Sequence, residues 1–171
     1  IVTCNKKLEN NAIRELESLF FLLGDKNARF IKSKVLGVIL GKISIDPRIA
    51  IREIRDLLNK KSWMPLFTKR YIPIDVTVKS DINEIKNAVM KLAEMIPIDK
   101  TFRITVEKRF TQISAKSLIN SIASNINRKV SLKNPDYIIL IEIIGSVTGL
   151  ALIKPDDILS VEKEILTKKR A

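Results

Sequence analysis

Residues 102–109 read Phe-Arg-Ile-Thr-Val-Glu-Lys-Arg, and residues 137–144 read Tyr-Ile-Ile-Leu-Ile-Glu-Ile-Ile. The first segment alternates apolar and polar side chains, which predicts a strand with one covered face. The second segment is apolar on both faces apart from Glu142, as in a central strand that helices cover. Residues 114–129 between them carry apolar side chains at helical spacing. The order strand, helix, strand predicts an α/β fold for this part of the chain.

Basic side chains stand at the ends of these predicted elements. The first strand ends in Lys108-Arg109, and the helix is expected to end in Arg128-Lys129. Lys133 and Asn134 lead into a turn at Pro135. Side chains at element ends can project into solvent, so this pattern is suited to binding phosphate groups.

Composition limits the class of partner. The chain has 171 residues, of which 46% are hydrophobic, so it can bury one average domain or two small ones. Lysine and arginine total 31 against 19 acidic residues, which gives a net charge of +12. This excess favours a polyanionic partner, either nucleic acid or an anionic membrane surface. The alternative is a charge that serves only solubility.

The residue types that are missing exclude several kinds of chemistry. The chain has no histidine, so the common general base and the Ser-His-Asp arrangement are both excluded. Its five glycines form neither a GxGxxG fingerprint nor a phosphate-binding loop. Cys4 is the single cysteine, which excludes an internal disulfide and favours a reducing, cytoplasmic setting. We therefore expect no enzyme activity, no cofactor and no metal. No apolar run approaches the ~20 residues that span a bilayer, so no membrane-spanning segment is expected. Nucleic acid is the expected partner, rather than a membrane surface.

The first part of the chain predicts a β-α-β-β-α order. The expected elements are a strand at 1–4, a helix at 8–23, two hairpin strands at 29–35 and 37–43, and a helix from Asp46 to the lysines 60 and 61. A fourth strand within 71–78 would complete a ferredoxin-like unit.

The second part restarts with another helix. Asp81 is the expected N-cap of a helix that ends near Ile96, and a strand at 147–153 follows a turn at 145–149. The pair Asp156-Asp157 is interpreted as a helix start without chemistry of its own. The predicted division places one domain at 1–68 and a second at 69–171.

From Tyr71 to Ser160, the order of elements and the sequences at 102–109, 132–136 and 137–143 resemble a THUMP domain. The resemblance implies an N-terminal ferredoxin-like domain followed by a THUMP domain, the pair that jointly holds the acceptor stem and 3′ end of tRNA. Residues 2–5 (Val-Thr-Cys-Asn) and 70–75 (Arg-Tyr-Ile-Pro-Ile-Asp) resemble the stand-alone THUMP proteins. Those proteins are similar to the tRNA acetylation adaptor, which helps a separate RNA cytidine acetyltransferase form N4-acetylcytidine.

The resemblance thus implies a non-catalytic, tRNA-binding adaptor with two partners, tRNA and an RNA cytidine acetyltransferase. An alternative is the RNA-binding half of a THUMP-containing tRNA methyltransferase or thiolation enzyme. A third possibility is a protein-interaction module whose basic face docks on an acidic partner. Of these three, we predict the non-catalytic tRNA-binding adaptor.

The predicted RNA-binding residues are basic or amide side chains near the ends of expected elements. They are Lys69, Arg70, Arg103, Lys108, Arg109, Lys116, Arg128, Lys129, Lys133 and Asn134. Each has a structural alternative. Lys69 and Arg70 could serve solubility in a linker, Arg103 could pair with Glu107, and cations such as Arg128 complement a helix dipole. The aromatic residues Trp63, Phe67 and Tyr71 could stack on bases or seal a domain surface.

Overall fold

The computed structural model describes residues 1–168, which form two compact units. The first unit comprises residues 1–73 together with the segment that begins at Asp157, and the second comprises residues 74–156. This division differs from the predicted boundary between residues 68 and 69. The strand that follows residue 67 belongs to the first sheet, and the chain returns to that sheet after the second unit is complete.

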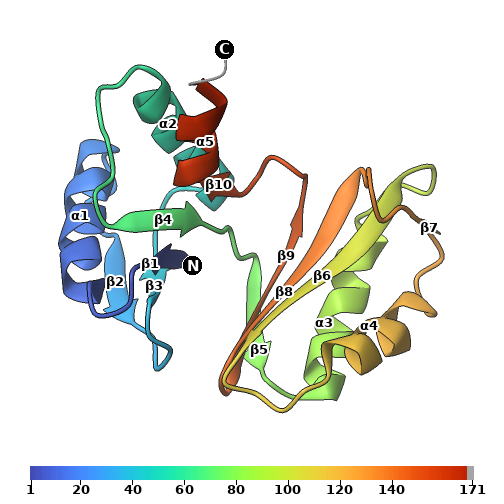
Figure 1. Cartoon of the computed structure of the whole chain (residues 1–171). Coiled ribbons are helices and arrows are strands. Elements are labelled where there is room, and N and C mark those ends of the chain that lie inside the picture. Colours follow the sequence, from blue (N-terminus) through green and yellow to red (C-terminus); the bar gives the residue numbers. More distant parts are fainter. Residues whose placement is uncertain (169–171) are drawn as a thin grey trace. The chain divides into compact units, whose positions relative to one another are not determined.

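The first unit is a five-stranded antiparallel sheet with helices (Figure 1). Its elements are β1 (Val2–Cys4), α1 (Glu9–Leu22), β2 (Arg29–Lys32), β3 (Val38–Lys42), α2 (Pro47–Asn59), β4 (Thr68–Tyr71), β10 (Leu159–Ser160) and α5 (Val161–Lys168). The strand order is β10-β4-β1-β3-β2. The predicted ferredoxin-like order of elements is therefore confirmed, and β10 extends the sheet at β4.

The fourth strand lies earlier in the chain than the sequence suggested. It was expected within residues 71–78, but β4 occupies Thr68–Tyr71. The reason is a contact with α1: the Glu15 carboxylate accepts hydrogen bonds from the backbone N–H groups of Leu66, Phe67 and Thr68, at 2.6, 3.0 and 2.9 Å. It also accepts one from the Thr68 hydroxyl at 2.6 Å. These bonds fix the start of β4 beside β1.

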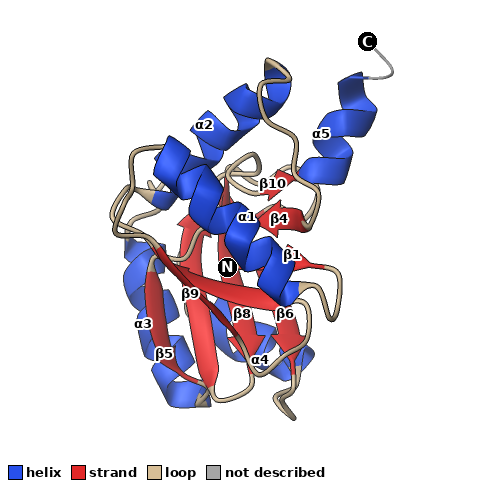
Figure 2. Cartoon of the chain, turned by 90° about the vertical axis from the view of Figure 1, so that its left-hand side faces the viewer, coloured by secondary structure: helices blue, strands red, loops and turns tan. Residues whose placement is uncertain are grey.

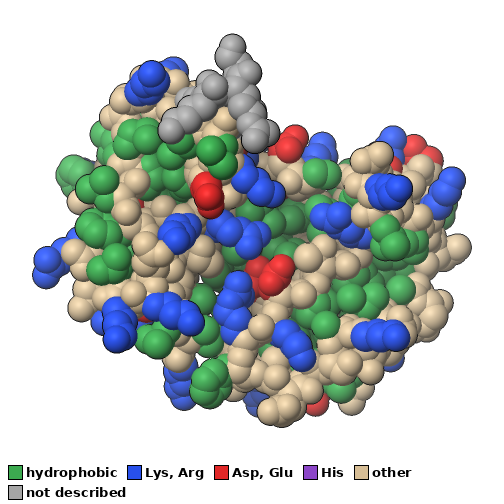
Figure 3. All heavy atoms as spheres, in the orientation of Figure 1, with side chains coloured by type: hydrophobic (Ala, Val, Ile, Leu, Met, Phe, Trp, Pro, Cys, Tyr) green, Lys and Arg blue, Asp and Glu red, His purple; other side chains and the backbone are tan. Residues whose placement is uncertain are grey.

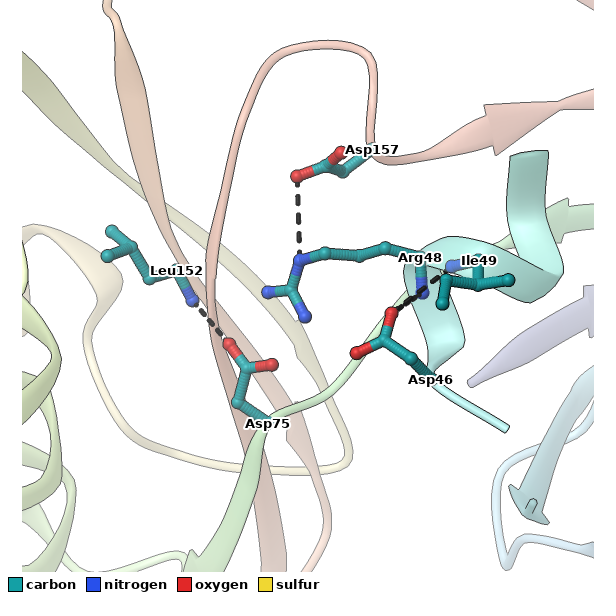
Figure 4. Close-up of polar contacts among 6 residues, drawn as sticks. All are labelled: Asp46, Arg48, Ile49, Asp75, Leu152 and Asp157. Carbon is teal, nitrogen blue, oxygen red and sulfur yellow. Dashed lines mark hydrogen bonds and ion pairs between the residues drawn. The ribbon is translucent and has the colours of Figure 1, made fainter. Parts of the chain in front are cut away.

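Local capping begins α2 as predicted. The Asp46 carboxylate accepts hydrogen bonds from the N–H groups of Arg48 and Ile49, at 2.8 and 3.1 Å (Figure 4). The interpretation of Asp156-Asp157 as a helix start was wrong, because α5 begins only at Val161. Instead, Asp157 forms an ion pair with Arg48 at 3.6 Å, which ties the returning segment to α2.

The core of the first unit lies between its sheet and helices. It includes Leu16, Leu19, Ile39, Ile54 and Leu159, all at most 1% exposed. The three aromatic residues that could have stacked on bases pack against this core instead. Tyr71 is buried and bonds Thr68 through its hydroxyl, while Trp63 and Phe67 are partly buried.

The second unit is a mixed five-stranded sheet with both helices on one face (Figures 1 and 2). Its elements are β5 (Val76–Lys79), α3 (Ile82–Glu94), β6 (Thr101–Arg109), α4 (Ala115–Ala123), β7 (Lys129–Val130), β8 (Tyr137–Ile144) and β9 (Val147–Ile153). The strand order is β5-β9-β8-β6-β7, with β6 parallel to both β7 and β8. The two strands that the sequence singled out are therefore adjacent and in register from Phe102↔Tyr137 to Arg109↔Ile144.

Side-chain alternation in these strands follows the prediction. Phe102 is fully buried beneath the helices, with Ile104 and Val106 packed beside it.

Two aspartates form local hydrogen bonds in the second unit. Asp81 caps α3 by accepting hydrogen bonds from the N–H groups of Asn83 and Glu84. Asp75, which directly precedes the edge strand β5, accepts a hydrogen bond from the N–H of Leu152 in β9 at 2.9 Å (Figure 4).

Two predicted boundaries in the second unit were wrong. The helix expected at 114–129 ends at Ala123, where the side chains of Ser121, Ser124 and Asn125 donate to backbone carbonyls of the last turns. Such side-chain bonds compete with helical pairing. Arg128 and Lys129 therefore do not lie in a last helical turn. The turn expected at 145–149 closes within two residues, with Gly145 at a φ of 59°.

Candidate nucleic-acid interface

The strand β6 separates the predicted basic residues of the second unit into two groups. Because β8 and β7 run parallel to β6, the segment 129–136 lies at the beginning of β6 and the segment 110–116 follows its end. We call these the Lys133 end (Lys129, Lys133 and Asn134, with Arg103 and Arg128) and the Lys108 end (Lys108 and Lys116). The nine residues of β6 are separated by steps of about 3.3 Å, so its first and last residues lie roughly 26 Å apart.

Arg109 is engaged within the protein. One guanidinium nitrogen lies 2.7 Å from a carboxylate oxygen of Glu142, which is fully buried in β8. Burying an ionised carboxylate away from water is energetically costly unless a nearby cation compensates its charge. Arg109 thus compensates a buried charge, and the sequence could not indicate this because the partner lies 33 positions later.

The Lys133 end is ordered by Asp136. Its carboxylate accepts hydrogen bonds from the N–H and the hydroxyl of Thr101, at 2.8 and 2.7 Å. The Thr101 N–H bond is the main cause that lowers the pKa of Asp136. This contact joins the turn before β8 to the first residue of β6, so that Lys133 and Asn134 are exposed on a fixed turn.

The two arginines at this end hold backbone carbonyls. Arg128 donates to the carbonyls of Ile96 and Asn127, both at 2.7 Å, and is half-buried. Arg103 donates to the carbonyl of Leu132 at 3.1 Å, rather than to Glu107. Its buried Nε has no hydrogen-bond partner within residues 1–168. Lys129, Lys133 and Asn134 are therefore the exposed members of the Lys133 end.

The Lys108 end combines exposed lysines with a pocket. Lys108 Nζ donates to the carbonyl of Ile113 at 3.1 Å, and Lys116 is exposed in the first turn of α4. An open pocket of about 550 Å³ lies beside the segment that joins β6 to α4. Its lining includes the hydroxyl side chains of Thr111, Ser114, Ser117 and Ser121 and the apolar side chains of Ile82 and Ile113.

Phe110 also lies at the Lys108 end, although it was not among the predicted site residues. Its side chain is 87% exposed, and its backbone has a φ of 60°. A phenylalanine is ordinarily assigned to the core, so only the structure reveals its position. One weak signal is present: Lys108 interrupts the apolar positions 102, 104 and 106, so Phe110 follows a point where the covered face of the strand has already ended.

Lys69 and Arg70 lie in the first unit, in β4 rather than in a linker. Arg70 is half-buried and stands opposite Thr3 of β1 and Ser160 of β10, while Lys69 is exposed. Both residues are thus carried by a strand with neighbours on each side, a more rigid placement than the expected linker.

Most of the positive charge belongs to the first unit. By sequence, that unit has 19 basic and 10 acidic residues, a net charge of +9, whereas the second unit has 12 basic and 9 acidic residues, a net charge of +3. On the face shown in Figure 3, lysine and arginine side chains outnumber acidic ones. A polyanion would therefore find favourable charge on the first unit as well as on the second.

Two further features were sought in the described part of the chain: a cluster of metal-binding side chains and a membrane-spanning helix. Within residues 1–168, no three His, Cys, Asp or Glu side chains are grouped so that they could hold a metal ion. None of the helices in that range is long and apolar enough to cross a membrane.

The fold is similar to that of several solved structures, among them three proteins that are 14–16% identical to this chain. The protein PH1313 from Pyrococcus horikoshii OT3 is 16% identical with a TM-score of 0.63, over 90% of this chain and 54% of that chain. TrmN from Thermus thermophilus is 14% identical with a TM-score of 0.53, over 88% and 43%. A 4-thiouridine synthetase solved with RNA and bound ATP is 16% identical with a TM-score of 0.50, over 90% and 41%. The chain thus spans about half the length of these proteins.

Sequence comparison identifies the second unit. No curated protein matches the chain. Residues 79–152, from the last residue of β5 to the penultimate residue of β9, match the model of the THUMP domain. The expected fold, a ferredoxin-like domain followed by a THUMP domain, is therefore confirmed, and residues 79–152 of this chain form a THUMP domain.

Proposed function

We propose that this chain binds tRNA through its acceptor stem and 3′ end and holds it for modification by another protein. The observation that carries the proposal is the THUMP domain at residues 79–152. Exposed lysines at both ends of β6 and the net charge of +9 on the first unit support it. A structurally similar protein, the 4-thiouridine synthetase, was solved with RNA.

The mode of binding follows from the chemistry of the exposed groups. A-form RNA presents phosphates and 2′-hydroxyls more readily than base edges. Lys108, Lys116, Lys129 and Lys133 offer ammonium groups without a planar fork for reading bases. Affinity should therefore be electrostatic. If about four to six phosphates are neutralised, binding weakens by roughly two to three powers of ten between low and moderate salt.

Our first candidate is a non-catalytic adaptor in the cytoplasm that presents tRNA to an RNA cytidine acetyltransferase for N4-acetylcytidine formation. Its support is the resemblance at residues 2–5 and 70–75 and the absence of histidine from the chain. The second candidate is the RNA-binding half of a THUMP-containing methyltransferase or thiolation enzyme. It is favoured by the likeness to proteins of which this chain covers 41–54%.

The test of RNA binding uses intact tRNA, tRNA trimmed at its 3′ end, and two double variants. Lys108→Ala/Lys116→Ala removes the exposed charge at one end of β6, and Lys129→Ala/Lys133→Ala removes it at the other. Arg109 stays unchanged because it compensates the buried Glu142. We expect intact tRNA to bind most tightly and each double variant to bind it more weakly. Equal affinity in every combination would contradict the proposed site.

The test that separates the two candidates is affinity purification from the native cell. Co-purification of a separate RNA cytidine acetyltransferase with tRNA supports the adaptor. Detection of this sequence only within a longer polypeptide that carries a methyltransferase or thiolation domain supports the second candidate.

A further inference from the structure

Phe110 occupies a backbone conformation that a phenylalanine normally avoids. Its φ of 60° lies in the left-handed region, where an L-residue with a bulky side chain is sterically strained. Its ring is 87% exposed, so burial does not offset that strain. Strain that a fold retains without a packing benefit is a reason to look for a binding function at the residue.

The neighbouring residues hold Phe110 in this conformation from both sides. On one side, the carbonyl of Arg109 accepts a hydrogen bond from the N–H of Gly145 at 2.9 Å. The Arg109 side chain forms the ion pair with Glu142. On the other side, the Thr111 hydroxyl accepts from the N–H of Ile113 at 3.2 Å. The ring is therefore presented to solvent by an anchored segment.

The surroundings of Phe110 suit a nucleotide. Lys108, two residues away, is exposed, and its ammonium group has donors beyond the one bonded to Ile113. The pocket of about 550 Å³ begins at Thr111 and has a volume typical of small-ligand sites. The hydroxyls of Thr111 and Ser114 accept bonds from the N–H groups of Ile113 and Ser117. Neither hydroxyl donates a bond within the described residues, so each can donate to a ligand.

From this arrangement we infer that Phe110 stacks on an unpaired base of the bound RNA. Lys108 contacts the phosphate beside that base, and the adjacent nucleotide enters the hydroxyl-lined pocket. Every base has a π-face, so stacking on a single aromatic ring selects unpaired nucleotides rather than a sequence. The inference rests on the proposed function and names the residue by which this chain distinguishes single-stranded from paired RNA.

The experiment compares two RNAs: a blunt hairpin, and the same hairpin with a short unpaired 3′ extension that carries 2-aminopurine. Binding is followed by anisotropy, and stacking by quenching of the 2-aminopurine fluorescence. The full chain is used, with Phe110→Gly, Phe110→Trp and the control Phe21→Ala. Phe21 is also an exposed phenylalanine, 66% exposed in α1.

We expect Phe110→Gly to bind the extended hairpin on the order of tenfold more weakly and to lose the quenching, because one base stack is removed. The blunt hairpin should bind as before. Phe110→Trp should retain both signals, and Phe21→Ala should match the unchanged chain. Phe110→Gly is not expected to lose stability, because glycine adopts a positive φ without strain.

The outcomes separate this inference from the proposed function. If the unchanged chain binds both hairpins equally, or Phe110→Gly binds the extended hairpin as tightly as the unchanged chain, RNA binding stands and the stacking role is overturned. The exposed ring would then point to a protein contact. If neither RNA nor intact tRNA binds, both proposals are overturned.

Discussion

Arg109 and Glu142 form an ion pair at 2.7 Å in which the carboxylate is fully buried and the guanidinium is one-quarter exposed. The pair joins β6 to β8, and Glu107 stands directly opposite Glu142 in the register of these strands. Arg109 thus places a guanidinium beside a buried carboxylate in a pair of strands that carries a second carboxylate at the same register position. Arg109, which the sequence predicted as an RNA contact, therefore has a structural role in stabilising the sheet.

Arg109→Ala should destabilise the protein by about 3 kcal/mol, because removing one member of a buried ion pair is strongly destabilising. The measurement is urea unfolding followed by circular dichroism. Lys108→Ala is the matched control. Lys108 is the exposed neighbour of Arg109, and its substitution should change the free energy of unfolding by less than about 0.5 kcal/mol. Replacing both members of the pair by leucine should recover much of the loss. A stable Arg109→Ala protein would show that the pair is dispensable.

The exposed lysines of the Lys108 end should contribute to RNA binding through charge alone. A phosphate contact contributes about 0.9 to the slope of log affinity against log salt concentration, so Lys108→Ala and Lys116→Ala should each reduce that slope by about 1. The measurement is filter binding of tRNA over a series of salt concentrations. Lys91→Ala, an exposed lysine in the last turn of α3, is the control. The same reduction for Lys91→Ala would indicate a general charge effect instead of a site.

Elements with local signals were predictable from the sequence. The carboxylates of Asp46 and Asp81 cap α2 and α3 as their positions suggested, and the alternation in β6 identified the face that packs beneath the helices. Capping and alternation depend on residues only a few positions apart.

The errors occurred where a distant residue decides the outcome. The start of β4 depends on Glu15, more than 50 positions earlier, and the role of Arg109 depends on Glu142. The exposure of Phe110 depends on the anchoring of the backbone beside it by Gly145. No spacing rule connects such residues, so the buried faces were easier to predict than the roles of the exposed side chains.

Gly37 and Gly24 give a second test of stability. Both have a positive φ, 78° and 84°, so alanine is strained at either position. A Cβ at Gly37 would lie 2.9 Å from the backbone oxygen of Cys4, whereas one at Gly24 would meet nothing within 4 Å. We expect Gly24→Ala to cost about 1 kcal/mol and Gly37→Ala clearly more, since steric overlap with backbone adds to the strain. Thermal unfolding of the two variants measures the difference, and equal losses would contradict the steric explanation.

Acid should destabilise the protein through carboxylates that are held as anions. The pKa of Glu9 is lowered mainly by the hydrogen bond from the N–H of Gly37, at 2.6 Å, and the pKa of Asp136 is lowered by Thr101. A lowered pKa in the folded state means that the unfolded chain binds the proton first as the pH falls. The stabilisation is therefore complete above the ordinary carboxyl pKa of about 4 and is lost as the pH drops through the lower folded value.

Urea unfolding of the unchanged chain, Glu9→Gln and Asp136→Asn between about pH 6 and about pH 3 checks this expectation. An amide oxygen can still accept the hydrogen bond but does not titrate, so each variant should lose less stability on acidification than the unchanged chain. Glu94→Gln, at an exposed carboxylate near the end of α3, is the control and should keep the full pH dependence. If the free energies of unfolding of all four proteins fall in parallel, other carboxylates cause the acid sensitivity and the bonds from Gly37 and Thr101 do not.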